Sequence, residues 1–562
     1  MTSLHPAAFL LLGGLLLPLL PLAARRVALL LLPLAGFYNL LGYQIGDGQV
    51  GSLAGYELHW VRVDQLSLLF GYLFHVAAFL AALFSLHLRD RLQQATGFLY
   101  AGAAVGAVFA GDLIVLFIFW ELLAISSVFQ IWATQSARAI AAGTRYLLIH
   151  ISSGLLLLVG TAWHYQQTGS LALGHLGIDS WATRLIFLGV GIKCAFPLLH
   201  SWLVDAYPES TPTGAVFLSS FTTKTAVYVL ARSFAGTEFL LYIGAAMAMF
   251  PIFYAVIEND LRRVLGYSMI NQIGFMVVGV GLGPGMGVNG AVAHAFNDVL
   301  FKGLLFMSMG AVLYRTGRIN GSDLGGLYKS MPWTCGFCMI GAASISAFPL
   351  FSGFVSKSMV MQAAANEGHL VVWLLLLFAS AGVFHHAGIK IPFFAFFAHD
   401  AGIRCREAPR NMLLAMGIGA ALCIGIGSFP HYLYRLLPYP VAYEPYDATH
   451  IVLQLQLLFF SALAFVALKL TGIYPPELRS ANIDVDWTSR KLLPSSARLC
   501  VQVGAPLWDG LIAWGKRQVF ALIDQVRQYH GPTGVFARAW PISSSVLLVT
   551  IFLAVYLFVY LG

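Results

Sequence analysis

The sequence predicts an all-α polytopic membrane protein, and three observations predict this class. Of the 562 residues, 59% are hydrophobic and only 10% are charged, and the mean hydropathy is +0.78. Apolar runs of about 20 residues, the length that a helix needs to cross a bilayer, follow one another along the chain. These runs lack the alternation of transmembrane β-strands. Because only helices and closed barrels satisfy the backbone in lipid, we expect about 14–16 transmembrane helices.

The spanning helices are predicted from the uninterrupted apolar runs, taken in order. We expect the run near 6–23 to be a first helix rather than a cleaved signal. A polar extramembrane loop is expected at 45–63, and residues 97–134 carry two helices that divide near Asp112. The other uninterrupted runs lie near 26–44, 65–88, 143–162, 238–257, 264–283, 286–315, 370–397, 411–430, 452–472 and 545–561.

Two further apolar runs, at 184–232 and 333–365, are interrupted by proline. Each contains the tetrapeptide Ala-Phe-Pro-Leu, close to Lys193 in the first run and to Lys357 in the second. Similar breaks in two similarly placed helices indicate an internally duplicated transporter with discontinuous helices. A simple proline kink in each helix is the alternative interpretation.

The stretch 473–543 differs in kind, because it is rich in charge and has no spanning run. Apolar residues recur at helical spacing from Leu507 to Val526, with charged residues between them. This pattern predicts an amphipathic helix along a membrane surface or a partner subunit. The predicted organisation is N-terminal transmembrane helices at 1–95, a first repeat at 96–235, a second repeat at 236–400, additional transmembrane helices at 401–472, an amphipathic interfacial segment at 473–543 and a final transmembrane helix at 544–562.

Composition also excludes several function classes. The net charge of +8 comes from basic residues scattered in short loops, where they set topology, so no nucleic-acid partner is expected. Cys335 and Cys338 lie within an apolar run and predict core packing rather than a metal site. The chain has no phosphate-binding loop, dinucleotide motif or iron–sulfur cysteine cluster. We therefore expect no cofactor, no metal and no enzymatic activity in this chain, with energy supplied by an ion gradient or a partner.

Five lysines and one glutamate inside the predicted spans are the main candidates for function: Glu121, Lys193, Lys224, Lys302, Lys357 and Lys390. A charge at the bilayer centre costs roughly 2.5–3.5 kcal/mol on insertion scales, so such residues usually serve ion or proton movement. Glu121 needs an ammonium partner, for which Lys193 and Lys224 are the candidates. A purely structural ion pair between helices is the alternative.

Lysine rather than arginine at these positions favours proton exchange. Burial favours the neutral amine and a nearby carboxylate favours the ammonium, so lysine can release and regain a proton, whereas arginine cannot. His294 and Asn297 share one helix face, and Lys302 lies about two turns from His294. This spacing predicts a His-to-Lys relay through bridging water. A hydrogen-bonded core histidine is the alternative for His294, and Asp298 is expected to anchor or neutralise.

Three residues are secondary candidates. Lys390 precedes a proline near a helix end, from which its long side chain can snorkel to the interface. His385 lies about one turn earlier, beside His386, and Asn297 is the third. We expect a further set of charged residues near loops to cap helices or set topology: Asp205, Asp260, Arg262 and Arg263.

Six segments between about 60 and 400 carry a family resemblance: GDLIVLFIFWELLAISS around Glu121, GIKCAFPLLHSWLVDAYPESTPTGAV around Lys193, TTKTAVYVLAR around Lys224, DLRRVLGYSMINQIGF at 260–275, HAFNDVLFKGLLFMSMG around Lys302 and FPLFSGFVSK ending at Lys357. In combination they resemble the antiporter-like membrane subunit family. Its members include large subunits of Mrp-type sodium/proton antiporters and proton-pumping subunits of respiratory complex I and membrane hydrogenases.

The resemblance implies two inverted five-helix repeats, each with a broken helix. It implies that Glu121 faces the neighbouring subunit's channel or the local lysine, and that Lys193 and Lys224 belong to a central half-channel and relay. Lys302 would continue this relay, and Lys357 would be the terminal lysine of the second broken helix. The lysine pattern looks most like the D-type subunit of Mrp antiporters, whereas 473–543 resembles the lateral-helix tail of the distal complex I subunit.

These observations together predict a subunit of a multisubunit cation (sodium)/proton antiporter in the cell inner (cytoplasmic) membrane. It would move protons along a midplane row of Lys, Glu and His, beside other integral membrane subunits. The alternatives are a proton-pumping subunit of a complex I-like NADH:quinone oxidoreductase or hydrogenase, a non-transporting scaffold, and an ion-coupled subunit of an inorganic-carbon uptake complex.

Overall fold

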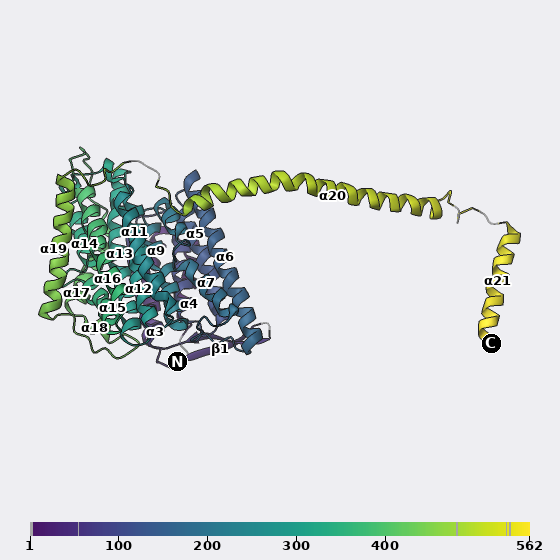
Figure 1. Ribbon diagram of the computed structural model, residues 1–562, viewed down its shortest axis with the longest axis horizontal. Helices are drawn as coiled ribbons and strands as arrows, with labels where there is room; N and C mark the ends of the chain where they lie inside the picture. Colours follow the sequence, from purple (N-terminus) through teal and green to yellow (C-terminus); the bar gives the residue numbers. More distant parts are fainter. Residues whose placement is uncertain (1–3, 54, 479–481, 535–536, 539–540, 562) are drawn as a thin grey trace. The chain divides into compact units, whose positions relative to one another are not determined.

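The computed structural model describes residues 4–53, 55–478, 482–534, 537–538 and 541–561. It divides into two units, Met1–Asp486 and Trp487–Gly562. The first unit is a bundle of helices that run side by side (Figure 1), which confirms the predicted all-α membrane class. In the described residues its strands are confined to one antiparallel hairpin inside the predicted polar loop, formed by β1 (Gly48–Leu53) and β2 (Tyr56–Arg62).

Twelve helical stretches of the described chain are long and apolar enough to cross a membrane. They are α2 (Leu22–Leu41), α3 (Gln65–Phe84), α5 (Leu113–Trp132), α6 (Ala137–Thr168), α9 with α10 (Gly214–Ser220 and Thr222–Ser233), α11 (Phe239–Ile257), α12 (Leu261–Leu282), α13 (Met286–Thr316), α16 with its irregular continuation (Leu370–Phe397), α17 (Arg410–Ser428), α19 (Ala448–Leu470) and α21 (Ile542–Leu561). Helix α4 (Arg91–Phe109) has a similar length but is outside this apolar set. Shorter helices are α1 (Ala8–Leu16), α18 (His431–Tyr434) and the halves of two interrupted helices.

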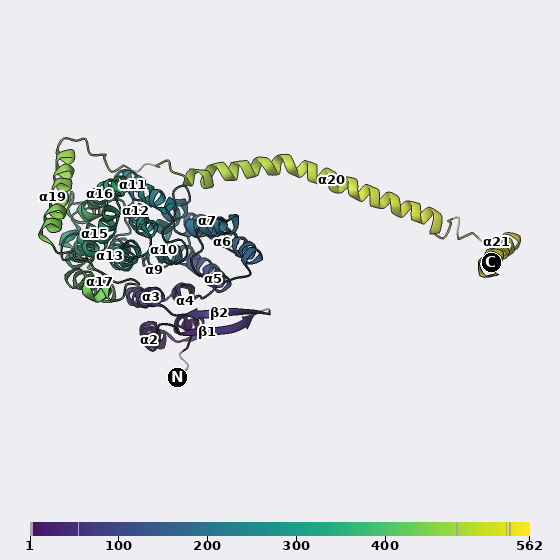
Figure 2. The same ribbon diagram turned by 60° about the horizontal axis from the view of Figure 1, so that its bottom comes forward.

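The helices that carry the internal charges lie in the middle of the first unit. The most apolar windows of α12 and of α9 with α10 are completely buried, and that of α13 is 89% buried. The corresponding window of α19 is only 11% buried. Figure 2 shows α10, α12 and α13 in the interior and α19 at the periphery of the bundle. The apolar outer surface suits lipid, whereas the charged residues are placed where protein can satisfy them.

The two Ala-Phe-Pro-Leu segments are genuine helix breaks. The first separates α7 (Trp181–Lys193) from α8 (Ser201–Ala206), and the second separates α14 (Pro332–Ile345) from α15 (Ser352–Asn366). In both tetrapeptides the alanine and the leucine have left-handed backbone angles, with φ of 61° and 69° in the first and 59° and 72° in the second. Because the chain leaves the helix for several residues, the simple-kink alternative is wrong.

We expect the left-handed leucines to control the stability of the breaks. Leu198 is mostly exposed, so changes there act through the backbone rather than through packing. Left-handed backbone costs L-residues roughly 1–2 kcal/mol, and β-branched residues tolerate it least. Leu198→Gly should therefore raise the thermal unfolding temperature in detergent, and Leu198→Val should lower it. The same Leu-to-Val change at Leu188, in helical backbone on α7, is the control; equal effects at both positions would contradict this prediction.

The regions around α5–α6 and α12–α13 repeat one local design. Asp112 accepts a backbone hydrogen bond as the N-cap of α5, and Asp260 does so as the N-cap of α12. Each aspartate also forms a backbone bridge with a residue that lies just after the next helix: Asp112 with Ala172, after α6, and Asp260 with Asn320, after α13. The second pair lies 148 residues after the first. The predicted capping role of Asp260 is confirmed, and the repetition agrees with the predicted duplication, whose boundaries stay a prediction.

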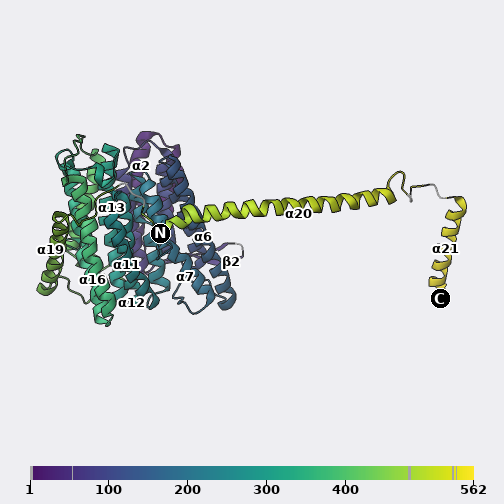
Figure 3. The same ribbon diagram turned by 45° about the horizontal axis from the view of Figure 1, so that its top comes forward.

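The second unit contains the helix predicted from amphipathic spacing. A short π-helical turn at Thr488–Leu492 leads into α20 (Leu493–His530), which Figure 3 shows as one long helix. Its 38 residues include none that is buried in this structure. A helix with an exposed apolar stripe needs a membrane surface or a partner to cover it. Its interfacial placement therefore stays a prediction.

Candidate functional site

Glu121 and Lys193 form the first part of the candidate site. Lys193, the last residue of α7, is completely buried and donates a hydrogen bond from Nζ to the carbonyl of Trp120, the residue before Glu121. Its Nζ also lies 4.4 Å from the centre of the Trp120 ring. Lys193 and Glu121 act on each other electrostatically. Of the two lysines predicted as partners of Glu121, Lys193 is therefore the one that the fold brings to it.

Gly154 on α6 makes room for the Glu121 carboxylate. A Cβ atom added at this position would overlap Glu121 Oε1, far inside any permitted contact. That oxygen is buried and has no hydrogen-bond partner among the described residues. This oxygen is thus held by packing and by the nearby charge of Lys193 rather than by a hydrogen bond.

Lys224 pairs with Asp298, which corrects the alternative that placed it beside Glu121. Lys224 Nζ lies 2.6 Å from Asp298 Oδ2, and both side chains are completely buried. Lys224 also donates to the carbonyl of Ser219 at 3.0 Å. This carbonyl is freed because the helix is interrupted at Phe221, between α9 and α10. The ion pair joins α10 to α13, and so links the first predicted repeat to the second.

Asp298 acts on two more lysines besides Lys224. Its charge influences Lys302 and Lys357, and Lys302 donates to Ser268 Oγ at 2.7 Å. Lys302 and Lys357 are both buried. One carboxylate therefore serves three lysines, so an ammonium on one of them disfavours an ammonium on the others. From the sequence, Asp298 is expected only to anchor or neutralise neighbouring charges. A carboxylate in the middle of a spanning helix nevertheless indicates a functional site by itself.

His294 lies between two neighbouring helices. As predicted, His294 and Asn297 share one face of α13, because both contact α15. His294 Nε2 lies 3.1 Å from Gln272 Oε1 on α12, and Nδ1 lies 3.1 Å from Ser356 Oγ on α15. Asn297 donates to the carbonyl of Ser352 on the same helix, α15, at 2.8 Å. Both His294 nitrogens are partnered, which suits a hydrogen-bonded core histidine as well as a relay.

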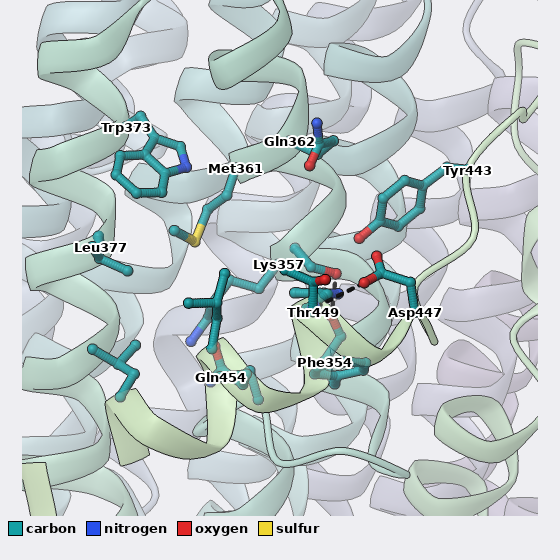
Figure 4. Close-up of a pocket in the computed structure, with 15 residues that line it drawn as sticks. Phe354, Lys357, Met361, Gln362, Trp373, Leu377, Tyr443, Asp447, Thr449 and Gln454 are labelled. Atoms are coloured by element: carbon teal, nitrogen blue, oxygen red, sulfur yellow. Dashed lines mark hydrogen bonds between the residues drawn. The ribbon is translucent and has the colours of Figure 1, made fainter. Parts of the chain in front are cut away.

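Lys357 lies at the second break. Its Nζ donates to the carbonyl of Ile345 at 2.9 Å and stands 5.1 Å from the centre of the Phe275 ring. Ile345 is the last residue of α14, so the ammonium stabilises the negative end of that half-helix. Lys357 also lines a cavity of about 220 Å³ (Figure 4).

Lys390 is a buried cap, so the prediction that it snorkels to the interface is wrong. It donates to the carbonyls of Ala255, Val256 and Glu258 at the end of α11, at 3.2, 2.6 and 2.6 Å. It also pairs with Glu477 at 3.0 Å. Four oxygen partners hold this ammonium, which favours a structural role. Beside it, His385 stacks on Tyr474, with ring centres 5.5 Å apart.

Glu477 belongs to a segment that the sequence pattern did not reveal, which we call the acidic strap (residues 474–478 and 482–486). Its second anchor is Asp484, which accepts a hydrogen bond from the Tyr267 hydroxyl at 2.7 Å and lies 3.2 Å from His200 Nε2. His200 follows the first proline break directly. The partners of Glu477 and Asp484 lie more than 80 residues away in sequence, and no local pattern predicts such contacts.

We expect the acidic strap to loosen in acid. Burial by itself raises the pKa of Asp484, but hydrogen bonds from His200 and Tyr267 outweigh it and hold that pKa below its usual value. A lowered folded-state pKa stabilises the strap above the ordinary aspartate value of about 3.9, and this contribution disappears as pH falls through the folded value. Hydrogen exchange in the strap should therefore rise below about pH 4. Asp484→Asn should show fast exchange already at neutral pH; slow exchange in that variant would contradict the prediction.

Comparisons with known proteins agree with the sequence motifs. Residues 110–384 match the family "NADH:quinone oxidoreductase/Mrp antiporter, TM". The chain is 30% identical to the A-type subunit of the Na(+)/H(+) antiporter of Alkalihalophilus pseudofirmus, over 77% of this chain and 62% of that protein. It is 32% identical to the N-type subunit of the NADH-quinone oxidoreductase of Desulforudis audaxviator, over 52% of this chain and 64% of that protein. The chain thus spans less than two thirds of the length of these curated relatives.

One solved structure shows a related fold over nearly the whole chain. A chain of the membrane-bound sulfane sulfur reductase, an archaeal respiratory membrane complex, is 22% identical, with a TM-score of 0.71 over 97% of this chain and 99% of that chain. The family match includes Glu121, Asp298 and Lys357 but ends before Lys390. By this match and these relatives, residues 110–384 of the chain belong to the NADH:quinone oxidoreductase/Mrp antiporter family of membrane subunits.

Proposed function

We propose that this chain is the proton-translocating membrane subunit of a multisubunit cation/proton antiporter. The observation that carries the proposal is the fully buried Lys224–Asp298 ion pair, 2.6 Å between Nζ and Oδ2. Buried charges in a membrane are costly and are usually kept for ion or proton movement. This pair joins α10 of the first predicted repeat, which holds Glu121 and Lys193, to α13 of the second, which holds Lys302 and Lys357.

The shared carboxylate supplies a way to move charge. Asp298 pairs directly with Lys224, and its charge also acts on Lys302 and Lys357, so an ammonium on one lysine disfavours an ammonium on the others. A proton that reaches Lys302 or Lys357 therefore weakens the hold of Asp298 on Lys224. Positive charge then shifts along the row. His294, hydrogen-bonded between α12 and α15, extends the polar path between them.

We further propose that the exchanged cation is sodium. Support comes from the name of one relative, which is a subunit of a Na(+)/H(+) antiporter, and from the lysine pattern that resembles the D-type subunit of Mrp antiporters. The partners would be other integral membrane subunits in the cytoplasmic membrane. They would also cover part of the exposed apolar stripe of α20.

A second candidate function is favoured by α20 and α21. A long amphipathic helix followed by one more spanning helix departs from a short D-type Mrp subunit and suits the tail of a complex I-like subunit. The relative named as a subunit of an NADH-quinone oxidoreductase supports the same candidate. In that case a redox partner, rather than a sodium gradient, would drive protons through the same row.

The test is sodium-dependent proton flux by the purified complex in proteoliposomes. Addition of sodium should dissipate an imposed pH gradient with the wild-type complex, and Lys224→Ala should abolish this response. Lys329→Ala is the matched control, because Lys329 forms an exposed ion pair with Asp400 and such pairs contribute little. Full sodium-dependent flux in Lys224→Ala would refute the transport proposal and favour a scaffold. Proton flux that needs a redox substrate and ignores sodium would favour the complex I-like candidate.

A further inference from the structure

The cavity beside Lys357 lies at the edge of the second predicted repeat. It is formed by α15, α16, α19 and the loop before α19, and it has a volume of about 220 Å³. Lys357 in its lining is 1% exposed, whereas Asp447 is exposed. Figure 4 shows Lys357 among the lining residues, with Tyr443, Asp447 and Gln454 from the loop and α19. The cavity has room for several waters, because one water needs roughly 10–15 Å³ of such volume.

Helix α19 turns a polar stripe towards this cavity. Asp447, His450 and Gln454 all line it, and their spacing of three and then four residues places them on one helix face. Most other residues of α19 are apolar and exposed, although Gln456, Ser461 and Lys469 are polar residues outside this stripe. Polar groups on a lipid-facing helix are unfavourable unless they serve a polar space. The stripe therefore belongs to the cavity.

Gln454 of the stripe and Lys357 both bind the end of α14. Gln454 Nε2 lies 3.2 Å from the carbonyl of Ser346, and Lys357 Nζ lies 2.9 Å from the carbonyl of the preceding residue, Ile345. The two side chains thus hold neighbouring peptide groups at the end of α14. One turn along α19, the His450 ring stacks on Phe354, with ring centres 4.6 Å apart.

The hydrogen bonds of His450 define its tautomer. Its Nδ1 lies 2.8 Å from the carbonyl of Pro445. A carbonyl oxygen only accepts, so Nδ1 carries the hydrogen and Nε2 is the nitrogen that can take up a proton. Asp447 in turn accepts a hydrogen bond from the His450 backbone at 2.8 Å as the N-cap of α19. A carboxylate therefore caps the helical turn that carries His450, at the exposed end of the stripe.

We propose that this cavity is the aqueous end of the proton path, with His450 as its proton carrier. The proposal rests on the proposed function. The Lys357 ammonium passes one proton through water to His450 Nε2 and becomes a neutral amine. The imidazolium then releases a proton to solvent beside the Asp447 carboxylate, which stabilises the passing positive charge. Gln454 is a positioning residue, because its amide orients water next to Lys357. Only N–H and O–H bonds form and break.

The first test measures water access along α19. Gln454 and Gln456 lie on different faces of the same helix, and only Gln454 lines the cavity. In a Cys405→Ser/Cys500→Ser background, Gln454→Cys should react with a charged methanethiosulfonate reagent about tenfold faster than Gln456→Cys, because the reaction needs a hydrated thiolate. Equal or slower labelling of Gln454→Cys would overturn the proposal.

The second test measures proton flux in proteoliposomes that contain the whole complex. His450→Phe keeps the stacking on Phe354 but removes the proton carrier, and a positioned carrier contributes on the order of 10² or more in rate, so we expect at least a tenfold loss. Gln454→Leu should lose flux as well, and Gln456→Leu should match the wild type. Normal flux in His450→Phe together with no flux in Lys224→Ala would overturn this inference alone. Normal flux in both variants would refute the proposed function itself.

Discussion

Asp298→Ala is expected to be the most damaging single substitution in this chain. It leaves the Lys224 ammonium completely buried, with only the Ser219 carbonyl as a partner. Removal of one member of a buried ion pair typically costs about 3–5 kcal/mol, because the other charge stays without compensation. Thermal unfolding of the purified complex in detergent should show this loss, and proteoliposomes should show no proton flux.

A double variant separates the structural role of the pair from its transport role. Lys224→Met/Asp298→Leu removes both charges at similar volume, and such replacements are often neutral or stabilising. We therefore expect unfolding temperatures near the wild type but no proton flux. A double variant that carries protons at the wild-type rate would show that the pair only holds α10 and α13 together.

Gly154→Ala is expected to inactivate the chain almost as strongly as loss of Glu121. The new methyl group would overlap the position of Glu121 Oε1. The carboxylate must then leave this position, which changes its placement relative to Lys193. Because a positioned proton-transfer group contributes on the order of 10² or more in rate, we expect proton flux in Gly154→Ala to fall to the level of Glu121→Gln.

Two further variants control for the effect of a methyl group in a helix. Gly336 on α14 has nothing within 4 Å of an added Cβ, so Gly336→Ala should keep full flux and gain about 0.5–1 kcal/mol of stability. Gly154→Ala/Glu121→Asp shortens the acid by one methylene and should recover part of the flux. Wild-type flux in Gly154→Ala, with loss in Glu121→Gln, would show that the site tolerates a displaced carboxylate.

Local sequence predicted most of the helices because a bilayer demands long apolar runs. The broken helices were predictable for a similar reason, since proline cannot continue a helix and the tetrapeptide occurs twice. The 38-residue length of α20 was predictable only as a tendency from its amphipathic spacing. Helix α6 is longer than the apolar run at 143–162 from which it was predicted. The polar residues at its two ends did not indicate how far the helix extends beyond that run.

The partners of the charged residues were much less predictable. Lys224 and Glu121 both lie in apolar runs, yet Lys224 pairs with Asp298 instead. Lys390 looked free to reach the interface, but Glu477 and three carbonyls at the end of α11 surround it. The strap that supplies Glu477 follows α19 and has no local pattern that predicts its destination.

The sequence alone therefore determined the membrane class, the two breaks and the identity of the costly buried charges. These properties follow from what each segment must do in lipid, where every unpaired backbone group or charge has a high free-energy cost. The tertiary structure alone decided which carboxylate serves which lysine, and which face of α19 meets Lys357. Such pairings depend on how distant helices pack against one another, and Coulomb interactions act through space rather than along the chain.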